Sequence, residues 1–248
     1  MGGAYPLRQC AVMDKEEQKH MDRVEEARRT LLALYGGSHS PLEESDPDFA
    51  AIKQRLVYGE LYAQEALDPV MRELILLAVA TTNQTMSEVK LHTCAALRSG
   101  ASPEAVKEAV YHCAPYIGLG KAEAAAAAVN EVLRTQGISL PLASQRTVSE
   151  EDRLTAGIAA QKSIFGPHID EMRAAAPNDK KPLQDYLSAY CFGDFYTRSG
   201  LDIRQRELLT FSILSAQGGC ENQIKAHAGG NAAVGNDKPL LLAALMLC

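Results

Sequence analysis

Apolar residues recur along this chain at spacings of three and four positions, which is the period of an amphipathic helix. Over positions 14–35 this stripe contains Met21, Val24, Ala27, Leu31 and Leu34. Gly36 and Gly37 follow, and glycine is a common residue at the end of a helix. Alternating Val, Ile and Thr residues, which indicate strands, are nearly absent. The pattern therefore predicts an all-α protein whose first helix covers 14–35.

Proline positions predict where several further helices begin. Asp68 is expected to cap the free amides of a helix whose first residue is Pro69. Pro47 and Pro103 should begin two more helices, and the second of these should end near Pro115. An Ala-rich helix is expected after Gly120 and should be closed by Gly137.

Two short patterns are typical of capping boxes, in which a Ser or Thr and an acidic residue three positions later satisfy each other's backbone amides. They pair Thr85 with Glu88 and Ser149 with Asp152. The first should begin a helix that runs to Ser99, and the second should begin a new helix after a linker over 137–149.

Much of the pattern occurs twice. The stretch that begins at Asp68 matches the stretch from Asp202 over roughly fifty residues with one insertion, which indicates an internal repeat. Matching pairs are Asp68 with Asp202, Arg72 with Arg206, Glu73 with Glu207, His92 with His227, Gly100 with Gly235, and YGELY from Tyr58 with FGDFY from Phe192. We predict a first repeat over 14–137 and a second, C-terminally short repeat over 149–248. A partner subunit or further sequence is expected to supply the counterpart of 114–137.

Composition narrows the function classes. The 248 residues carry a formal charge of −6 without clusters of Lys and Arg, so nucleic acid is not an expected partner. No apolar run approaches the ~20 residues that a membrane-spanning helix needs. The six cysteines form no C-x-x-C pair and no close metal-type spacing. A cytoplasmic protein without membrane association is the expectation.

Glu73, Glu88 and His92 form the candidate site of the first repeat. Glu88 and His92 are four residues apart, which places both on one helix face. Singly, each has a structural interpretation: Glu73 in a first helical turn complements the helix dipole, Glu88 belongs to a capping box, and His92 is a core histidine. Because Glu and His recur together in the second repeat, a functional pairing is predicted.

The segments RELILLAVA from Arg72 and SEVKLHTCAALRSGASPEAVKEAVYHCAPYIG from Ser87 resemble the carboxymuconolactone decarboxylase family, which includes alkylhydroperoxidase D-type (AhpD-like) proteins. The resemblance extends to both repeats. It implies an AhpD-like all-α helical bundle in a tandem duplicated form. It also implies a homo-oligomer, and for the fused chain we expect a trimer.

Peroxidase-type members of this family place C-x-x-C at the start of the helix that bears the histidine, with a Glu on the preceding helix. The first repeat has Thr85 and Glu88 at the two cysteine positions. The second has Cys220 and Gln223, followed by His227 and preceded by Glu207, so no disulfide can form within its site. The first repeat instead resembles decarboxylase-type members, which carry Glu-x-x-x-His here.

The resemblance implies a carboxy-lyase that acts on a small carboxylated lactone in aromatic-compound catabolism. Loss of carbon dioxide sends an electron pair through the ring alkene into the lactone carbonyl, so no cofactor is required. The protein must supply a donor for the enolate oxygen and an acid for carbon. His92 is expected to act here, oriented by Glu73 and Glu88, and the cations that could anchor the anionic substrate are Arg72, Lys90 and Arg98.

Three alternatives remain open from the sequence. A thiol peroxidase of the peroxiredoxin type could use Cys220 and His227, with a resolving thiol from elsewhere. A metal could bind Glu73, Glu88 and His92, although carboxylate-bridged bundles use a three-residue Glu-x-x-His spacing and this spacing is four. A non-catalytic helical oligomer is the third.

Overall fold

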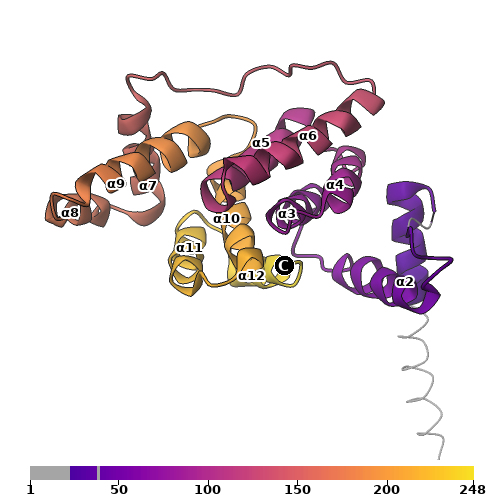
Figure 1. Cartoon of the computed structure of the whole chain (residues 1–248). Coiled ribbons are helices and arrows are strands. Elements are labelled where there is room, and N and C mark those ends of the chain that lie inside the picture. Colours follow the sequence, from indigo (N-terminus) through magenta and orange to yellow (C-terminus); the bar gives the residue numbers. More distant parts are fainter. Residues whose placement is uncertain (1–22, 38–39) are drawn as a thin grey trace, which may run out of the picture. The chain divides into compact units, whose positions relative to one another are not determined.

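The computed structural model describes residues 23–37 and 40–248, so positions 14–22 of the first predicted helix lie outside the described residues. The chain separates into an N-terminal unit, Met1–Glu65, and a main unit, Ala66–Cys248 (Figure 1). Every element within the described ranges is a helix, a turn or a loop, with no strand. The predicted all-α class is confirmed.

The N-terminal unit contains a helix over 23–35, α2 at Pro47–Gln54 and the π-helical segment η1 at Arg55–Leu61. Gly36 and Gly37 have φ angles of 78° and 147°, so the glycine pair ends the first helix as predicted. A small core joins Ala27, Leu31 and Tyr58.

The main unit contains the remaining helices. They are α3 (Pro69–Thr82), α4 (Met86–Arg98), α5 (Pro103–Ile117), α6 (Leu119–Thr135), α7 (Arg153–Phe165), α8 (His168–Ala175), α9 (Lys181–Leu187), the π-helical segment η2 (Ser188–Tyr196), α10 (Ile203–Gln217), α11 (Glu221–Ala233) and α12 (Lys238–Leu245). Residues 138–149 form the predicted linker between α6 and α7 and contain no helix or strand.

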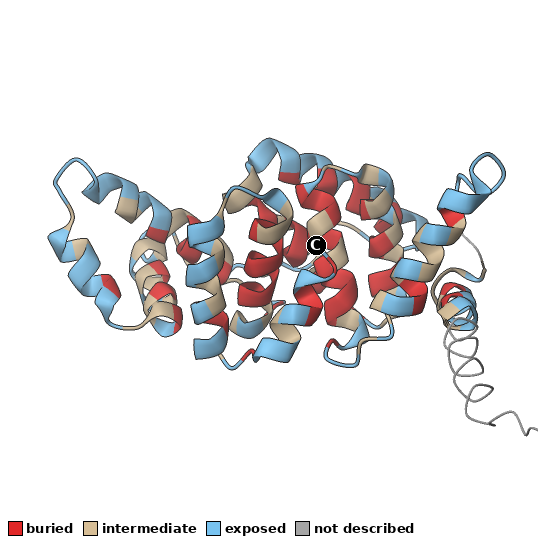
Figure 2. Cartoon of the chain, turned by 90° about the horizontal axis from the view of Figure 1, so that it is seen from below, coloured by how far each residue is buried: buried red, intermediate tan, exposed pale blue. Residues whose placement is uncertain are grey.

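Helices α3 and α10 form the centre of the main unit. They pack against each other and both contact α5, while α4 packs on α3 and α11 packs on α10. Four of their apolar residues, Leu74, Leu77, Leu209 and Ile213, have no exposed surface. Buried residues, red in Figure 2, gather in the interior of this unit and exposed residues cover its outer turns. Polar side chains on α3 and α10 are therefore surrounded by packed apolar residues, and burying them requires partners.

Each repeat contains the same close contact between a glycine of its π-helical segment and the preceding helix. A Cβ added to Gly59 in η1 would lie 2.1 Å from the carbonyl oxygen of Arg23, and one added to Gly193 in η2 would lie 2.3 Å from that of Arg153. Only glycine permits so close an approach between a helix and its neighbour. Both repeats thus use a π-helical segment and a glycine at the same place, in agreement with an internal duplication.

The two predicted capping boxes need correction, although α4 begins directly after Thr85 as predicted. Thr85 forms no capping box, because its hydroxyl donates to the Ala80 carbonyl 3.2 Å away. The second box is half formed: the Asp152 carboxylate accepts the Ser149 amide at 2.6 Å, but the helix begins only at Arg153. Helix α5 continues two residues beyond Pro115, where the proline removes one hydrogen bond in the last turn.

Candidate functional site

Helices α3 and α4 bring Glu73 and His92 together. Asp68 caps α3 by accepting the Met71 amide at 3.0 Å, as predicted, and this start turns Glu73 toward α4. The Glu73 Oε2 atom lies 2.9 Å from His92 Nδ1. Glu73 is 1% exposed and His92 5%, so the pair is almost fully removed from solvent. A buried carboxylate satisfied by an imidazole N–H is a stable arrangement.

This geometry corrects the expected position of Glu73. The residue lies in the second turn of α3 and not in the first, which contains no acidic residue. Its carboxylate points at His92 from the interior, so complementing the exposed end of the helix dipole is not its role.

Glu88 occupies the other side of the imidazole. Its Oε2 atom lies 3.7 Å from His92 Nε2, and its side chain is 31% exposed. A carboxylate only accepts hydrogen bonds, so we assign the Nδ1 proton to the contact with Glu73. The Nε2 edge then faces Glu88. The ring therefore lies between one buried carboxylate and one that reaches solvent.

The second repeat contains the same pair. His227 Nδ1 lies 2.9 Å from Glu207 Oε2, which involves the same atoms as the pair in the first repeat. Glu207 has no exposed surface and also accepts a hydrogen bond from the Tyr196 hydroxyl at 2.6 Å. Burial raises the pKa of Tyr196 well above its usual value, so this hydroxyl stays a donor at neutral pH. Thr210, which stands where the first repeat has Leu76, lies 2.7 Å from the same hydroxyl.

The other second-repeat candidates lie away from this pair. Cys220 is the N-cap residue of α11, seven residues before His227, which corresponds to about 10 Å along a helix. No hydrogen bond joins the two side chains in the part of the chain that the structure describes. Gln223, the counterpart of Glu88, is exposed. A thiol at Cys220 therefore lacks direct contact with the Glu207–His227 pair.

The three candidate substrate anchors have different surroundings. Arg72 is buried and donates to the Leu67 carbonyl at 3.0 Å. Lys90 forms an exposed ion pair with Glu131 at 2.5 Å. Arg98 is an exposed residue in the last turn of α4.

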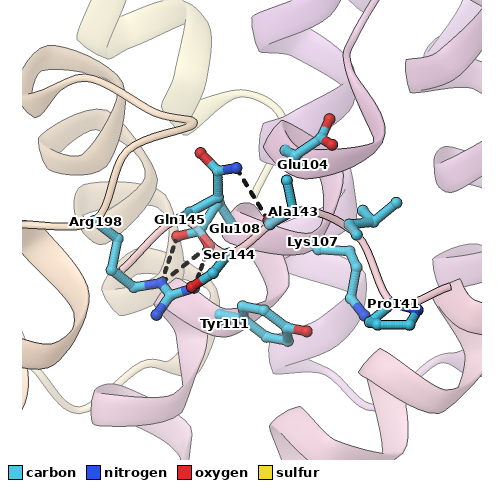
Figure 3. Close-up of a pocket in the computed structure, with 10 residues that line it drawn as sticks. Glu104, Lys107, Glu108, Tyr111, Pro141, Ala143, Ser144, Gln145 and Arg198 are labelled. Carbon is cyan, nitrogen blue, oxygen red and sulfur yellow. Dashed lines mark hydrogen bonds and ion pairs between the residues drawn. The ribbon is translucent and has the colours of Figure 1, made fainter. Parts of the chain in front are cut away.

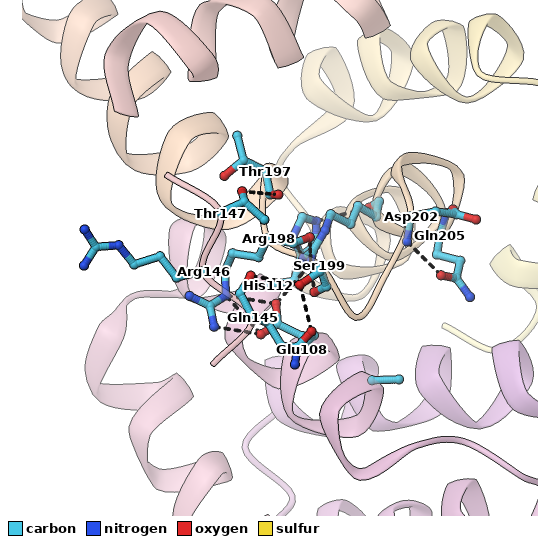
Figure 4. Close-up of polar contacts among 12 residues, drawn as sticks. Glu108, His112, Gln145, Arg146, Thr147, Thr197, Arg198, Ser199, Asp202 and Gln205 are labelled. Carbon is cyan, nitrogen blue, oxygen red and sulfur yellow. Dashed lines mark hydrogen bonds and ion pairs between the residues drawn. The ribbon is translucent and has the colours of Figure 1, made fainter. Parts of the chain in front are cut away.

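A buried ionic cluster joins the two repeats, and it was not predicted from the sequence. Both carboxylate oxygens of Glu108 on α5 lie 3.0 Å from Arg198 Nε (Figure 3). One of them also accepts from Arg206 Nη2 at 3.0 Å, and Arg206 has no exposed surface. His112 lies next to this cluster (Figure 4), with Nδ1 3.4 Å from Arg206 Nη1. The sequence identified Arg206 only as the counterpart of Arg72 in the second repeat.

In the sequence, this cluster is indicated by a difference between the two repeats. Glu108 aligns with Ala243 and His112 aligns with Leu247, so charged or polar residues stand where the other repeat is apolar. Such a difference at a helix face that is otherwise apolar indicates a partner on a neighbouring element. It does not identify the partner.

Within residues 23–37 and 40–248, no group of three or more His, Cys, Asp or Glu side chains is arranged to hold a metal ion. None of the described helices is both long enough and apolar enough to cross a bilayer.

Comparison with known proteins identifies the family of this chain. The sequence profile of the carboxymuconolactone decarboxylase family matches residues 47–131 and 181–247, one segment in each repeat. The chain belongs to this family. The two matched segments include both Glu–His pairs, and they confirm the resemblance seen in the sequence.

One curated protein and one solved structure resemble this chain. The 4-carboxymuconolactone decarboxylase of Acinetobacter baylyi (strain ATCC 33305 / BD413 / ADP1) is 29% identical over 98 residues, which is 40% of this chain and 73% of the relative. A crystal structure attributed to a gamma-carboxymuconolactone decarboxylase subunit of Burkholderia xenovorans LB400 has a TM-score of 0.58 at 21% identity. The structural match covers 90% of this chain and 88% of the chain in that crystal structure. At that identity the second likeness shows the shared fold alone.

Proposed function

We propose that this chain is a cofactor-free carboxy-lyase and that Glu73, Glu88 and His92 carry its chemistry. The observation that supports this most is the position of His92 between a buried carboxylate at 2.9 Å and a partly exposed one at 3.7 Å. This arrangement orients the imidazole and leaves its Nε2 edge available for proton transfer. The family and its decarboxylase relative favour this reaction class.

The proposed substrate is a small carboxylated lactone of aromatic-compound catabolism, with 4-carboxymuconolactone as the first compound to test. The bond between the ring carbon and the carboxylate breaks, and carbon dioxide leaves. The electron pair moves through the ring alkene to the lactone carbonyl oxygen, forming an enolate. The Nε2–H group of protonated His92 would donate a hydrogen bond to this oxygen, and Glu73 would stabilise the cationic ring.

The second half of the reaction returns a proton to carbon. Glu88 would exchange a proton between His92 Nε2 and solvent, because its side chain is 31% exposed and lies 3.7 Å from that nitrogen. His92 or Glu88 can then protonate the enolate carbon, which completes the reaction without an external oxidant or reductant. Neither glutamate needs to form a covalent bond with the substrate.

The decisive experiment measures carbon dioxide release from 4-carboxymuconolactone by His92→Gln and by its matched counterpart His227→Gln. Loss of general acid–base catalysis should lower kcat by about 10² to 10⁴ in the first variant. The second should keep most of the activity, because the second repeat has Gln223 where the first has Glu88. Glutamine keeps size and hydrogen bonding, so both variants should fold.

Glu88→Gln separates a chemical role from a structural one. A fall in kcat of a hundredfold or more, with an unchanged melting temperature, is expected from loss of proton exchange. Full activity with a lowered melting temperature would make Glu88 a structural residue. No turnover of 4-carboxymuconolactone by the wild-type chain would count against the substrate, and equal loss in both His variants would count against the choice of repeat.

A further inference from the structure

A solvent-accessible hollow lies between α5 and the linker over 138–149, lined by neither Glu–His pair (Figure 3). Its volume is about 170 Å³, which accommodates a small organic molecule but is small for a nucleotide. All its lining residues belong to the main unit.

The walls of the hollow combine an aromatic face, apolar linker residues and two cations. Lys107 Nζ lies 5.4 Å from the centroid of the Tyr111 ring, and Arg198 Cζ lies 5.8 Å from the same centroid. Pro141 and Leu142 of the linker contribute apolar surface. The Tyr111 ring and both cations therefore line the same hollow.

The charges around the hollow leave one positive charge in excess. Arg198 and Arg206 share the single carboxylate of Glu108, which leaves +1 among these three groups. Lys107 and Glu104 also line the hollow and cancel each other formally. Lys107 Nζ donates to the neutral Asn130 Oδ1 at 2.9 Å, so its own charge is not neutralised by that contact. A monoanion in the hollow would balance the group.

Burial of Glu108 makes this excess persistent. Glu108 is 1% exposed and Arg206 is fully buried, so both are fixed within the protein. The Arg198 side chain is 22% exposed and lines the hollow. A charge near low-dielectric walls attracts an anion more strongly than a fully solvated one does.

We propose that this hollow is a binding site for a small flat organic monocarboxylate. Its carboxylate faces Lys107 and Arg198, and its apolar body lies against Tyr111 and Leu142. The apolar walls favour such a molecule over inorganic phosphate, which has no apolar surface to bury. The site is separate from Glu73, Glu88 and His92, so it stands whether or not the proposed decarboxylase reaction is correct.

The test uses benzoate as the probe and benzamide as a neutral probe of nearly the same shape. The full-length protein is prepared with 13C-labelled tyrosine rings, and the Tyr111 signal is assigned by its absence in Tyr111→Phe. Benzoate should shift this signal and saturate in the millimolar range, while benzamide should bind about fivefold or more weakly. The same benzoate shift should remain in His92→Gln, which separates this site from the proposed active site.

Matched lysine variants test the charge argument. Lys107→Gln should weaken benzoate binding by about fivefold or more, because one of the two facing cations is removed. Lys90→Gln, which removes an exposed ion-paired lysine outside the hollow, should leave it unchanged. The proposal is overturned by an unshifted Tyr111 signal at about 50 mM benzoate, by equal binding of benzamide, or by equal behaviour of the two lysine variants.

Discussion

His112 on α5 places its Nε2 atom 3.1 Å from the backbone carbonyl oxygen of Arg206 on α10, and so links the two repeats through a buried imidazole. The same nitrogen lies 2.9 Å from the Thr210 hydroxyl. Burial, with the adjacent Arg206 charge, holds the pKa of His112 well below its usual value. The ring is therefore neutral, with Nε2–H donating and Nδ1 facing the guanidinium.

The first prediction follows from this neutral histidine. In the unfolded chain His112 takes up a proton below about pH 6.5, while in the folded chain it resists protonation. Stability from this group is therefore complete above about pH 6.5 and falls as the pH drops toward the folded pKa, by up to about 1.4 kcal/mol per pH unit. In urea unfolding between pH 7 and 5, His112→Gln should show a shallower decline than the wild type.

The control for this measurement is the exposed His168. His168→Gln should keep the wild-type pH dependence, because His168 lies at the surface at the start of α8, outside the buried contacts of His112. Parallel curves for His112→Gln and the wild type would contradict a buried neutral His112.

The second prediction concerns the carboxylate shared by two arginines. Glu108→Gln leaves Arg206 fully buried without a counter-charge, which should lower the free energy of unfolding by roughly 3 to 5 kcal/mol. Arg198→Gln is the matched control. It preserves the Glu108–Arg206 pair and removes a partly exposed partner, so its effect should be about 1 kcal/mol or less. Equal losses in urea titrations would show that Arg206 does not depend on Glu108.

The sequence predicted helix positions and the Glu–His pairs because both depend on local spacing and on repetition. Asp68 caps its helix through a contact with a residue only three positions away. The four-residue spacing places Glu88 beside His92 in any helix. The Glu108–Arg206 contact joins residues 98 positions apart. No periodicity specifies which helices meet, so this contact required the tertiary structure.

Local signals also failed where a side chain had a competing partner. Thr85 has the sequence of a capping residue, but its hydroxyl reaches back to the Ala80 carbonyl. The π-helical segments were equally invisible, because a π-helical turn differs from an α-helical one by a single residue that no spacing in one sequence reveals. Glu73 was placed one turn too early, although its pairing with His92 was correctly expected.

The third prediction distinguishes two adjacent glycines of α11. A Cβ at Gly230 would lie 2.6 Å from Glu207 Oε2, whereas one at Gly229 meets no atom within 4 Å. Gly230→Ala should displace Glu207 from His227 and lower the free energy of unfolding by about 1 to 3 kcal/mol. Gly229→Ala should be neutral or stabilising by up to about 1 kcal/mol, since alanine favours helix over glycine. Thermal or urea unfolding of the two variants makes the comparison, and a harmless Gly230→Ala would be evidence against the close packing.

The fourth prediction ranks cysteine reactivity. Cys220 is partly exposed at the start of α11, so a reagent in solution can reach its sulfur. Burial raises the pKa of Cys191 to about 12 and also raises that of Cys113. Iodoacetamide at pH 8, followed by peptide mass spectrometry, should modify Cys220 before these two. Peroxide should oxidise Cys220 without catalytic turnover, and sustained peroxide consumption that disappears in Cys220→Ser would favour the peroxidase alternative.

The last prediction is that the chain forms a homo-oligomer, with a trimer as the expected state. Helix α12 exposes Leu242, Leu245 and Met246 on one face, at spacings of three and four. Val110, the counterpart of Leu245 on α5, has no exposed surface, while Leu245 is 46% exposed. An apolar face that one repeat buries and the other exposes is suited to a subunit contact.

Analytical ultracentrifugation at micromolar concentration should therefore give three times the 26.8 kDa of one chain. A double variant, Leu242→Glu with Met246→Glu, should shift the mass toward that of one chain, because two carboxylates would have to be desolvated in the contact. Its helical circular dichroism should not change, since both side chains are exposed within one chain. A wild-type mass of one chain would refute the oligomer, and a variant that remains trimeric would place the contact on another surface.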